Sequence, residues 1–306
     1  MDDKEVSAVT EDKAADVTET DNKTAKKHFD WIKLVFILMF IVGMGFFFYP
    51  TVSDVYGKYR DSKLIAKYSK NVSGMKDADM HEAMEAAYAY NTVLKSKNTH
   101  TVYGEQYETD DEYEKLLKIN GSGLMCYMDI PAIAVTLPIY HYSNDNVLSK
   151  GIGHIHGSSL PVGGDGCHSV LIGHRGLPSL KLFSDLDKIK EGDVFYIHLY
   201  DEVHAYRVYE VVTVLPTEVE NLVMEDGRDL VTLVTCTPYG INTHRILVKG
   251  ERVDYNGEET KADTVSVIMH TVDPKTWLGI GIMLFALIMF IVSKIINRKK
   301  KKTVSE

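Results

Sequence analysis

The sequence predicts a mainly β protein: a closed or nearly closed β-barrel with an N-terminal helical extension, flanked by two transmembrane helices. Two long apolar stretches lie near the two ends of the 306-residue chain. Residues 52–97 carry apolar side chains at helical spacing, and from residue 124 apolar residues alternate in short runs separated by Gly, Pro and Asp. With 45% hydrophobic residues and a net charge of −9, the chain is expected to fold and to bind no nucleic acid.

Residues 31–50 and 277–296 are the predicted transmembrane helices. The first stretch carries one charge, Lys33, and residues 277–293 carry none. A helix needs about 20 mostly apolar residues to cross the hydrocarbon layer of a membrane. The alternatives are a buried core helix for either stretch and a cleaved signal peptide for the first. The absence of a polar face and of a small-residue cleavage site argues against them.

Positive charge flanks both stretches on the sides nearest the chain ends. Lys23, Lys26 and Lys27 precede the first stretch, and six Lys and Arg residues follow the second, within residues 294–306. Basic flanks stay in the cytoplasm. We therefore expect a cell-membrane protein with residues 51–275 outside, a disordered cytoplasmic tail at 1–30 and a basic cytoplasmic tail at 297–306.

The predicted extracellular part begins with a helical extension over residues 51–123. Within it, Thr109-Asp110-Asp111-Glu112 has the form of a capping box before Tyr113. The predicted barrel domain covers residues 124–270, and many short strands with few helices between them favour barrel closure. Its expected strands are 124–130, 134–140, 169–173, 194–199, 205–215, 230–235 and 245–249, with a further one at 264–269.

Two of the predicted strand ends carry residues suited to acyl transfer. Residues 169–173 lead into His174 and a glycine turn, where an imidazole can shuttle protons. Residues 230–235 lead into Cys236, and a Pro-Tyr-Gly turn brings Arg245 back towards the thiol. A nearby cation favours the thiolate, and a guanidinium can donate to a developing oxyanion. The structural alternative is a surface histidine, with a buried cysteine beside a surface arginine.

A metal site is the competing interpretation of the same region. Five His and Cys residues in this region are candidate metal ligands, and His-x-His can hold zinc. Their spacing fits no standard zinc pattern, so we expect neither a metal nor a cofactor. An odd number of extracellular cysteines leaves at least one thiol free, and Cys126 reads as a buried strand residue. The five candidate ligands are His154, His156, Cys167, His168 and His174.

Residues 232–236, Thr-Leu-Val-Thr-Cys, resemble the TLxTC signature of sortases, the membrane-anchored cysteine transpeptidases of Gram-positive bacteria. A transmembrane segment after the catalytic domain is also common in their class C, pilus-assembling branch. The resemblance implies a sortase β-barrel in which Cys236 is the nucleophile, His174 the general acid and base, and Arg245 the oxyanion stabiliser. It spans about residues 124–252, through the class C-like segments 137–141, 158–178, 181–198 and 237–252.

The resemblance also implies substrates and partners. Family members cleave an LPxTG-like C-terminal sorting signal of a pilin or surface protein through a thioacyl-enzyme, and a lysine amine of the next pilin resolves it. The alternatives are a housekeeping sortase that anchors surface proteins to peptidoglycan and a non-enzymatic membrane scaffold. Residues 90–123 lack the Asp-Pro-aromatic lid motif usual in class C. Either the lid is absent and this is an exposed linker, or Tyr103 or Tyr107 plugs the groove. His156 also stands where relatives often have Glu.

Overall fold

The computed structural model describes residues 31–97, 110–119, 123–177, 180–218 and 222–255, together with residues 257 and 281. The chain divides into two compact units, Met1–Phe48 and Tyr49–Glu306. Apart from residue 281, the predicted second span lies outside the described residues. Both predicted cytoplasmic tails, the possible strand at 264–269 and most of the expected lid region also lie outside them.

The first predicted span is helical. Helix α1 (Trp31–Ser73) begins at the first residue of that span and continues through Pro50. In the first unit, its apolar side chains are open to the surroundings, and Phe36 and Phe46 are 66% and 79% exposed. Among the described residues, α1 alone is long and apolar enough to cross a membrane. Exposed apolar side chains along such a helix fit a lipid environment.

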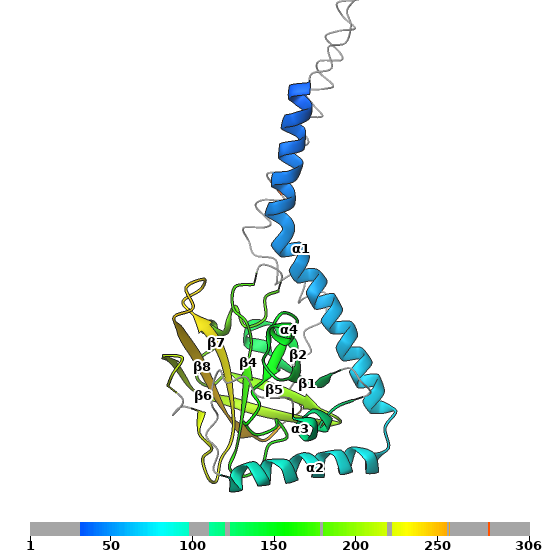
Figure 1. Cartoon of the computed structure of the whole chain (residues 1–306), viewed down its shortest axis with the longest axis vertical. Coiled ribbons are helices and arrows are strands. Elements are labelled where there is room, and N and C mark those ends of the chain that lie inside the picture. The colour runs from blue at the N-terminus through cyan, green and yellow to red at the C-terminus, as the bar shows by residue number, and fades with distance from the viewer. Residues whose placement is uncertain are drawn as a thin grey trace, which may run out of the picture. The chain divides into compact units, whose positions relative to one another are not determined.

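In the second unit, two helices pack on the barrel and form the predicted helical extension (Figure 1). The hydroxyl of Tyr68 on α1 accepts a hydrogen bond from the backbone N–H of Tyr200 at 2.9 Å. Helix α2 (Asp77–Ser96) buries residues at three- and four-residue spacing, which is the pattern of a helix with one apolar face. Asn91 on that face is bonded to both backbone groups of Leu160, at 2.7 and 3.0 Å.

Helix α3 (Asp111–Lys115) starts one residue later than a capping box at Thr109 would place it. Its N-cap is Asp110, whose Oδ1 accepts hydrogen bonds from the backbone N–H groups of Glu112 and Tyr113 at 3.0 and 3.1 Å. An aspartate satisfies unpaired N–H groups at a helix start as well as a threonine does. Thr109 itself lies outside the described residues.

Eight strands of the described chain close into one barrel, in the order β1-β2-β3-β4-β7-β8-β6-β5, which confirms the predicted fold class. Neighbouring strands are antiparallel except for two parallel pairs, β2 with β3 and β4 with β7. The strands are β1 (Leu124–Ile130), β2 (Val135–His141), β3 (Ile152–His154), β4 (Cys167–Ile172), β5 (Val194–Leu199), β6 (Glu202–Val214), β7 (Asp229–Thr237) and β8 (His244–Val253). Short helices η1 (Pro131–Ile133), α4 (Asp145–Leu148) and η2 (Leu186–Lys188) lie in the connections.

The barrel residues separate into two apolar clusters on opposite faces of β7 and β8. The main cluster includes Leu233 and Val248, and the second includes Val234 and Leu247. Side chains alternate between the two faces of a strand. A residue two positions from a member of one cluster therefore lies on the same face of β7 or β8 as that cluster.

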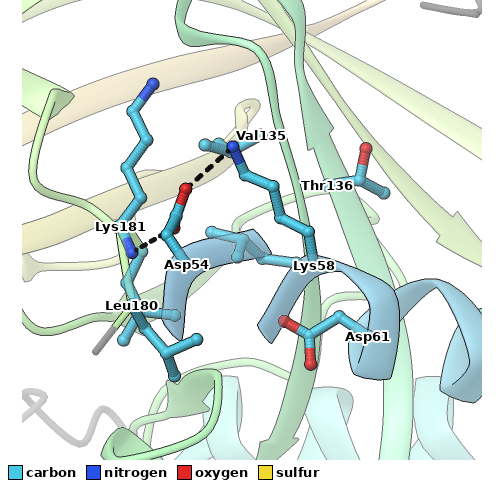
Figure 2. Close-up of a pocket in the computed structure, with 9 residues that line it drawn as sticks. Asp54, Lys58, Asp61, Val135, Thr136, Leu180 and Lys181 are labelled. Atoms are coloured by element: carbon cyan, nitrogen blue, oxygen red, sulfur yellow. Dashed lines mark hydrogen bonds and ion pairs between the residues drawn. The ribbon is translucent and has the colours of Figure 1, made fainter. Parts of the chain in front are cut away.

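A small cavity of about 30 Å³ lies where α1 meets the barrel (Figure 2). Asp54 of α1 accepts a hydrogen bond from the backbone N–H of Lys181 at 2.9 Å and pairs with Lys58 at 3.1 Å. Two residues after Lys181, the fully buried Phe183 lies beneath the end of β4. The contact at Asp54 therefore joins α1 to the segment that supports the β4 end.

Candidate active site

Cys236 and Arg245 face each other across two paired strands. In the register of β7 and β8 they are direct partners, and both are half-buried. Opposite residues of an antiparallel pair point to the same face, with Cβ atoms about 4.5–5.5 Å apart. The predicted return of Arg245 towards the thiol is therefore present in the fold.

His174 reaches the same level from the other side of β7. The parallel register pairs Ile172 of β4 with Val234 of β7. The pairing continues one residue further. The backbone N–H of Gly173 donates to the Val234 carbonyl at 3.1 Å, and the Gly173 carbonyl accepts from the Thr235 hydroxyl at 2.8 Å. His174 and Cys236 each lie two residues beyond the Ile172–Val234 pair. They are thus neighbours at the ends of adjacent strands.

The second apolar cluster shows that Cys236 and Arg245 lie on one face. Val234 and Leu247 both belong to this cluster, and Ile172 packs against it. Cys236 is two residues after Val234, and Arg245 is two residues before Leu247, so strand alternation returns both to this face. The register therefore places Cys236 and Arg245 side by side on this face, with His174 just beyond the end of β4.

The loop that carries His174 is fixed by several contacts. The His174 carbonyl accepts from the Phe183 N–H at 3.2 Å, and Gly176 donates to the Ser184 hydroxyl at 3.1 Å. Gly176 has a φ of +82°, and a side chain there would approach the ring of Tyr239 at 3.2 Å. A glycine fits this turn because it adopts positive φ at low cost and lets the aromatic ring pack closely.

Arg245 is oriented by its own turn. Its Nη1 donates to the carbonyls of Asn242 and His244, both at 3.0 Å. These bonds fix the plane of a guanidinium whose five N–H donors have a rigid geometry. Such a group can present donors to a carbonyl oxygen near Cys236.

The other two cysteines lie in environments that oppose thiolate chemistry. None of the three cysteines is in a disulfide. Cys126 is fully buried, and burial raises the pKa of its thiol. Burial, followed by the charge of Asp229, also raises the pKa of Cys167. Cys236 is thus the half-buried thiol that the site offers.

Two buried histidines of the competing metal interpretation have both ring nitrogens engaged in hydrogen bonds. His154 contacts the Tyr113 hydroxyl and the Ser159 carbonyl at 2.7 and 2.8 Å. His168 contacts the Val223 carbonyl and the Thr232 hydroxyl at 2.6 and 2.7 Å. Within the described residues, no group of three or more His, Cys, Asp and Glu side chains is arranged to hold a metal ion.

The sequence interpretation missed one contact at this site and one at α3. Arg175, next to His174, bonds to Thr237, next to Cys236, at 3.2 Å. His156, which had no assigned role, contacts Asp110 at 3.1 Å. The adjacency of Arg175 to His174 was visible in the sequence, but no local pattern indicated either partner.

Comparison with known proteins places this arrangement in a family. A family model described as "Sortase domain" matches residues 128–253. Sortase C1 of Streptococcus agalactiae is 42% identical, with a TM-score of 0.59 over 63% of this chain and 100% of that structure. Sortase C of Streptococcus pneumoniae, whose structure is described as informing pilin substrate specificity, is 41% identical, with a TM-score of 0.56 over 63% of this chain and 97% of that structure. Sortase A of Streptococcus agalactiae is 27% identical over 234 residues, 75% of this chain and 87% of that protein.

Proposed function

We propose that Cys236 is the nucleophile of this protein, His174 its general acid and base, and Arg245 its oxyanion stabiliser, because the chain belongs to the sortase family of cysteine transpeptidases. The observation that carries these roles is the register of three adjacent strands. Cys236 is the direct partner of Arg245 on β8, and His174 follows the last paired residues of β4 at the same level. A nucleophile, a proton shuttle and an oxyanion donor at one level are what acyl transfer needs.

The proposed reaction has two balanced halves. The Cys236 thiolate attacks the carbonyl carbon of the scissile Thr–Gly bond, and Arg245 stabilises the oxyanion. The carbon–nitrogen bond then breaks, a thioester remains on Cys236, and protonated His174 gives its proton to the departing amine. A lysine amine attacks the thioester, His174 takes one proton from it, and the carbon–sulfur bond breaks. The products are an isopeptide bond and the regenerated thiolate.

The proposed substrate is an LPxTG-like sorting signal of a pilin, and the proposed acceptor is a lysine of the next pilin. The identities support this assignment. The sortase C relatives are 41% and 42% identical to this chain, whereas the sortase A of Streptococcus agalactiae is 27% identical. This favours pilus polymerisation over anchoring to peptidoglycan. A thioester stores the acyl energy, so the amine needs no nucleotide to react.

We also infer that the enzyme works at the outer surface of the cell membrane. The apolar start of α1 supports one membrane span. The basic residues around both apolar stretches support cytoplasmic termini and an extracellular barrel.

The test uses the full chain in detergent with a peptide that carries an LPxTG-type motif. Intact-mass spectrometry should find one acyl adduct, and peptide mapping should place it on Cys236. A lysine peptide added next should consume the adduct and yield a branched product. Adduct formation without a branched product would reduce the proposal to a hydrolase.

Matched cysteine variants make the test specific. Cys236→Ala should lose the adduct while keeping the thermal transition of the wild type, because Cys236 is only half-buried. Cys167→Ala should keep the adduct. An adduct that survives Cys236→Ala would overturn the assigned nucleophile.

A further inference from the structure

The ends of β4 and β7 are joined beyond their last backbone hydrogen bonds by one side chain. Arg175 directly follows His174, and Thr237 directly follows Cys236. The Nη1 group of Arg175 donates to the Thr237 hydroxyl at 3.2 Å, and its Nη2 group donates to Asp187 at 2.6 Å. Asp187 lies on η2, so one guanidinium links three separate segments around the proposed site.

Arg175 is unusually buried for an arginine in an ion pair near the surface. Its side chain is 9% exposed, whereas that of Asp187 is 42% exposed. Its Nε is buried and has no hydrogen-bond partner among the residues that the structure describes. Arginine is rarely so buried unless paired, because removing a cation from water is costly. The bonds to Thr237 and Asp187 offset that cost, so this arginine is held in one place.

We propose that Arg175 is a positioning residue that sets the spacing between His174 and Cys236. This inference rests on the roles proposed for those two residues. The hydrogen bonds of Gly173 align the strands up to that residue, and the Arg175–Thr237 bond extends the alignment past His174 and Cys236. Small misplacements of reacting groups lower rates strongly, so such a link affects the chemical steps rather than substrate affinity.

The fork of the guanidinium explains why arginine stands at this position. Its two Nη groups point at different partners, Thr237 on β7 and Asp187 on η2. A lysine carries the same charge on a single nitrogen and cannot hold both partners in the same geometry. Arg175→Lys and Thr237→Val therefore both break the link without changing the charge of the site.

The experiment measures acylation by an LPxTG-type peptide in the full chain in detergent, for the wild type, Arg175→Lys, Thr237→Val and the double variant. Each single variant should lower the acylation rate constant by about tenfold or more and leave the peptide KM within about twofold. The double variant should be no slower than the slower single variant, because both remove the same bond.

Arg228→Lys is the matched control. Arg228 also bridges two partners, Glu225 and Glu251, but it precedes the first residue of β7, at the opposite end from Cys236. The acylation rate constant of the Arg228→Lys variant should equal that of the wild type.

Three results would overturn the positioning role: unchanged rates in both single variants, a raised KM at constant acylation rate, or additive losses in the double variant. If Arg175→Lys does not fold, Thr237→Val decides alone. A wild-type protein that forms no Cys236 adduct would instead refute the proposed function, so the two failures are distinguishable.

Discussion

At the scale of single residues, Arg245 combines fixed turn contacts with its proposed role as oxyanion stabiliser. Its Nη1 bonds to the carbonyls of Asn242 and His244 hold the guanidinium, and the register makes Arg245 the direct strand partner of Cys236. We predict that Arg245→Lys lowers kcat by about 10²- to 10³-fold, because one ammonium cannot reproduce both the turn contacts and the oxyanion contact. Steady-state kinetics with an LPxTG-type peptide and a lysine acceptor measures the loss.

Arg207→Lys provides the comparison for Arg245. Arg207 is exposed on β6, where its register partners are Val194 and Glu251 rather than residues of the proposed site. The Arg207→Lys variant should keep the kcat and KM of the wild type. Equal kinetics for Arg245→Lys and the wild type would remove Arg245 from the mechanism.

His154 is a buried base that the fold keeps neutral. Its Nε2 faces the Ser159 carbonyl, which can only accept, so Nε2 carries the proton and Nδ1 accepts from the Tyr113 hydroxyl. Burial, aided by the neighbouring His141 and His156, lowers its pKa from the usual 6.5 to about 3. Protonation would place a second N–H against Tyr113 in an apolar site.

This shift predicts a stability loss in mild acid. Between pH 6.5 and 3 the unfolded chain protonates His154 and the folded chain does not, so the free energy of unfolding falls as pH falls. One such group changes the free energy of unfolding by up to about 1.4 kcal/mol per pH unit. Denaturant titrations from pH 6.5 to 4.5 should give a shallower pH slope for His154→Gln than for the wild type. His81→Gln, at a side chain 75% exposed, should keep the wild-type slope, and equal slopes for all three proteins would contradict the prediction.

At the scale of elements, α3 is attached to the barrel through its N-cap. Besides capping the helix, Asp110 contacts His156 through Oδ2 at 3.1 Å, and its backbone N–H donates to the Tyr142 hydroxyl at 2.8 Å. Tyr113, fully buried on α3, forms edge contacts with the rings of Tyr142 and His156. His156, to which the sequence interpretation assigned no role, therefore has a structural partner in Asp110.

We predict that Asp110→Ala lowers the free energy of unfolding by about 1–2 kcal/mol, since it removes both the cap and the His156 contact. Asp111→Ala is the matched control: Asp111 is the exposed first residue of the same helix, and it should cost less than about 0.5 kcal/mol. Chemical denaturation of both variants at pH 7 gives the comparison. A loss for Asp110→Ala no larger than that for Asp111→Ala would show that α3 is held by Tyr113 alone.

The elements that the sequence could predict are those with a local signal. Strands β1 and β5 occupy the expected residues 124–130 and 194–199, because alternation and turn residues bound them on both sides. Strand β3 was missed, since three residues with a central glycine have no alternation. Strands β7 and β8 extend beyond their predicted ranges at both ends, where pairing continues past the apolar run. Strands β4 and β6 start before their predicted ranges and end one residue short of them.

The same reasoning separates the predictable part of the site from the rest. Cys236 and His174 could be found because each ends an apolar run at a turn, and Arg245 because a short turn returns it. The parallel pairing of β4 with β7, which makes His174 a neighbour of Cys236, joins residues about 60 positions apart and leaves no local pattern. The resemblance, not periodicity, supplied that link. The Arg175–Thr237 contact depends on the same pairing.

At the scale of the whole molecule, the remaining question is on which side of the membrane each part lies. The barrel with its site belongs to the unit Tyr49–Glu306, and α1 begins in the other unit. Charge asymmetry predicts an external site and two internal ends. If only the first apolar stretch spans, the C-terminal tail would lie outside with the barrel, so the position of that tail distinguishes one span from two.

Cysteine accessibility tests this topology in intact cells. We predict that a membrane-impermeant maleimide labels the half-buried Cys236 from outside. In a Cys236→Ala background, Ser305→Cys and Ser7→Cys should be labelled only after permeabilisation, because basic flanks are expected to keep both tails in the cytoplasm. The buried Cys126 and Cys167 should remain unlabelled in both states and set the background. Labelling of Ser305→Cys in intact cells would eliminate the second span, and failure to label Cys236 from outside would contradict the extracellular site.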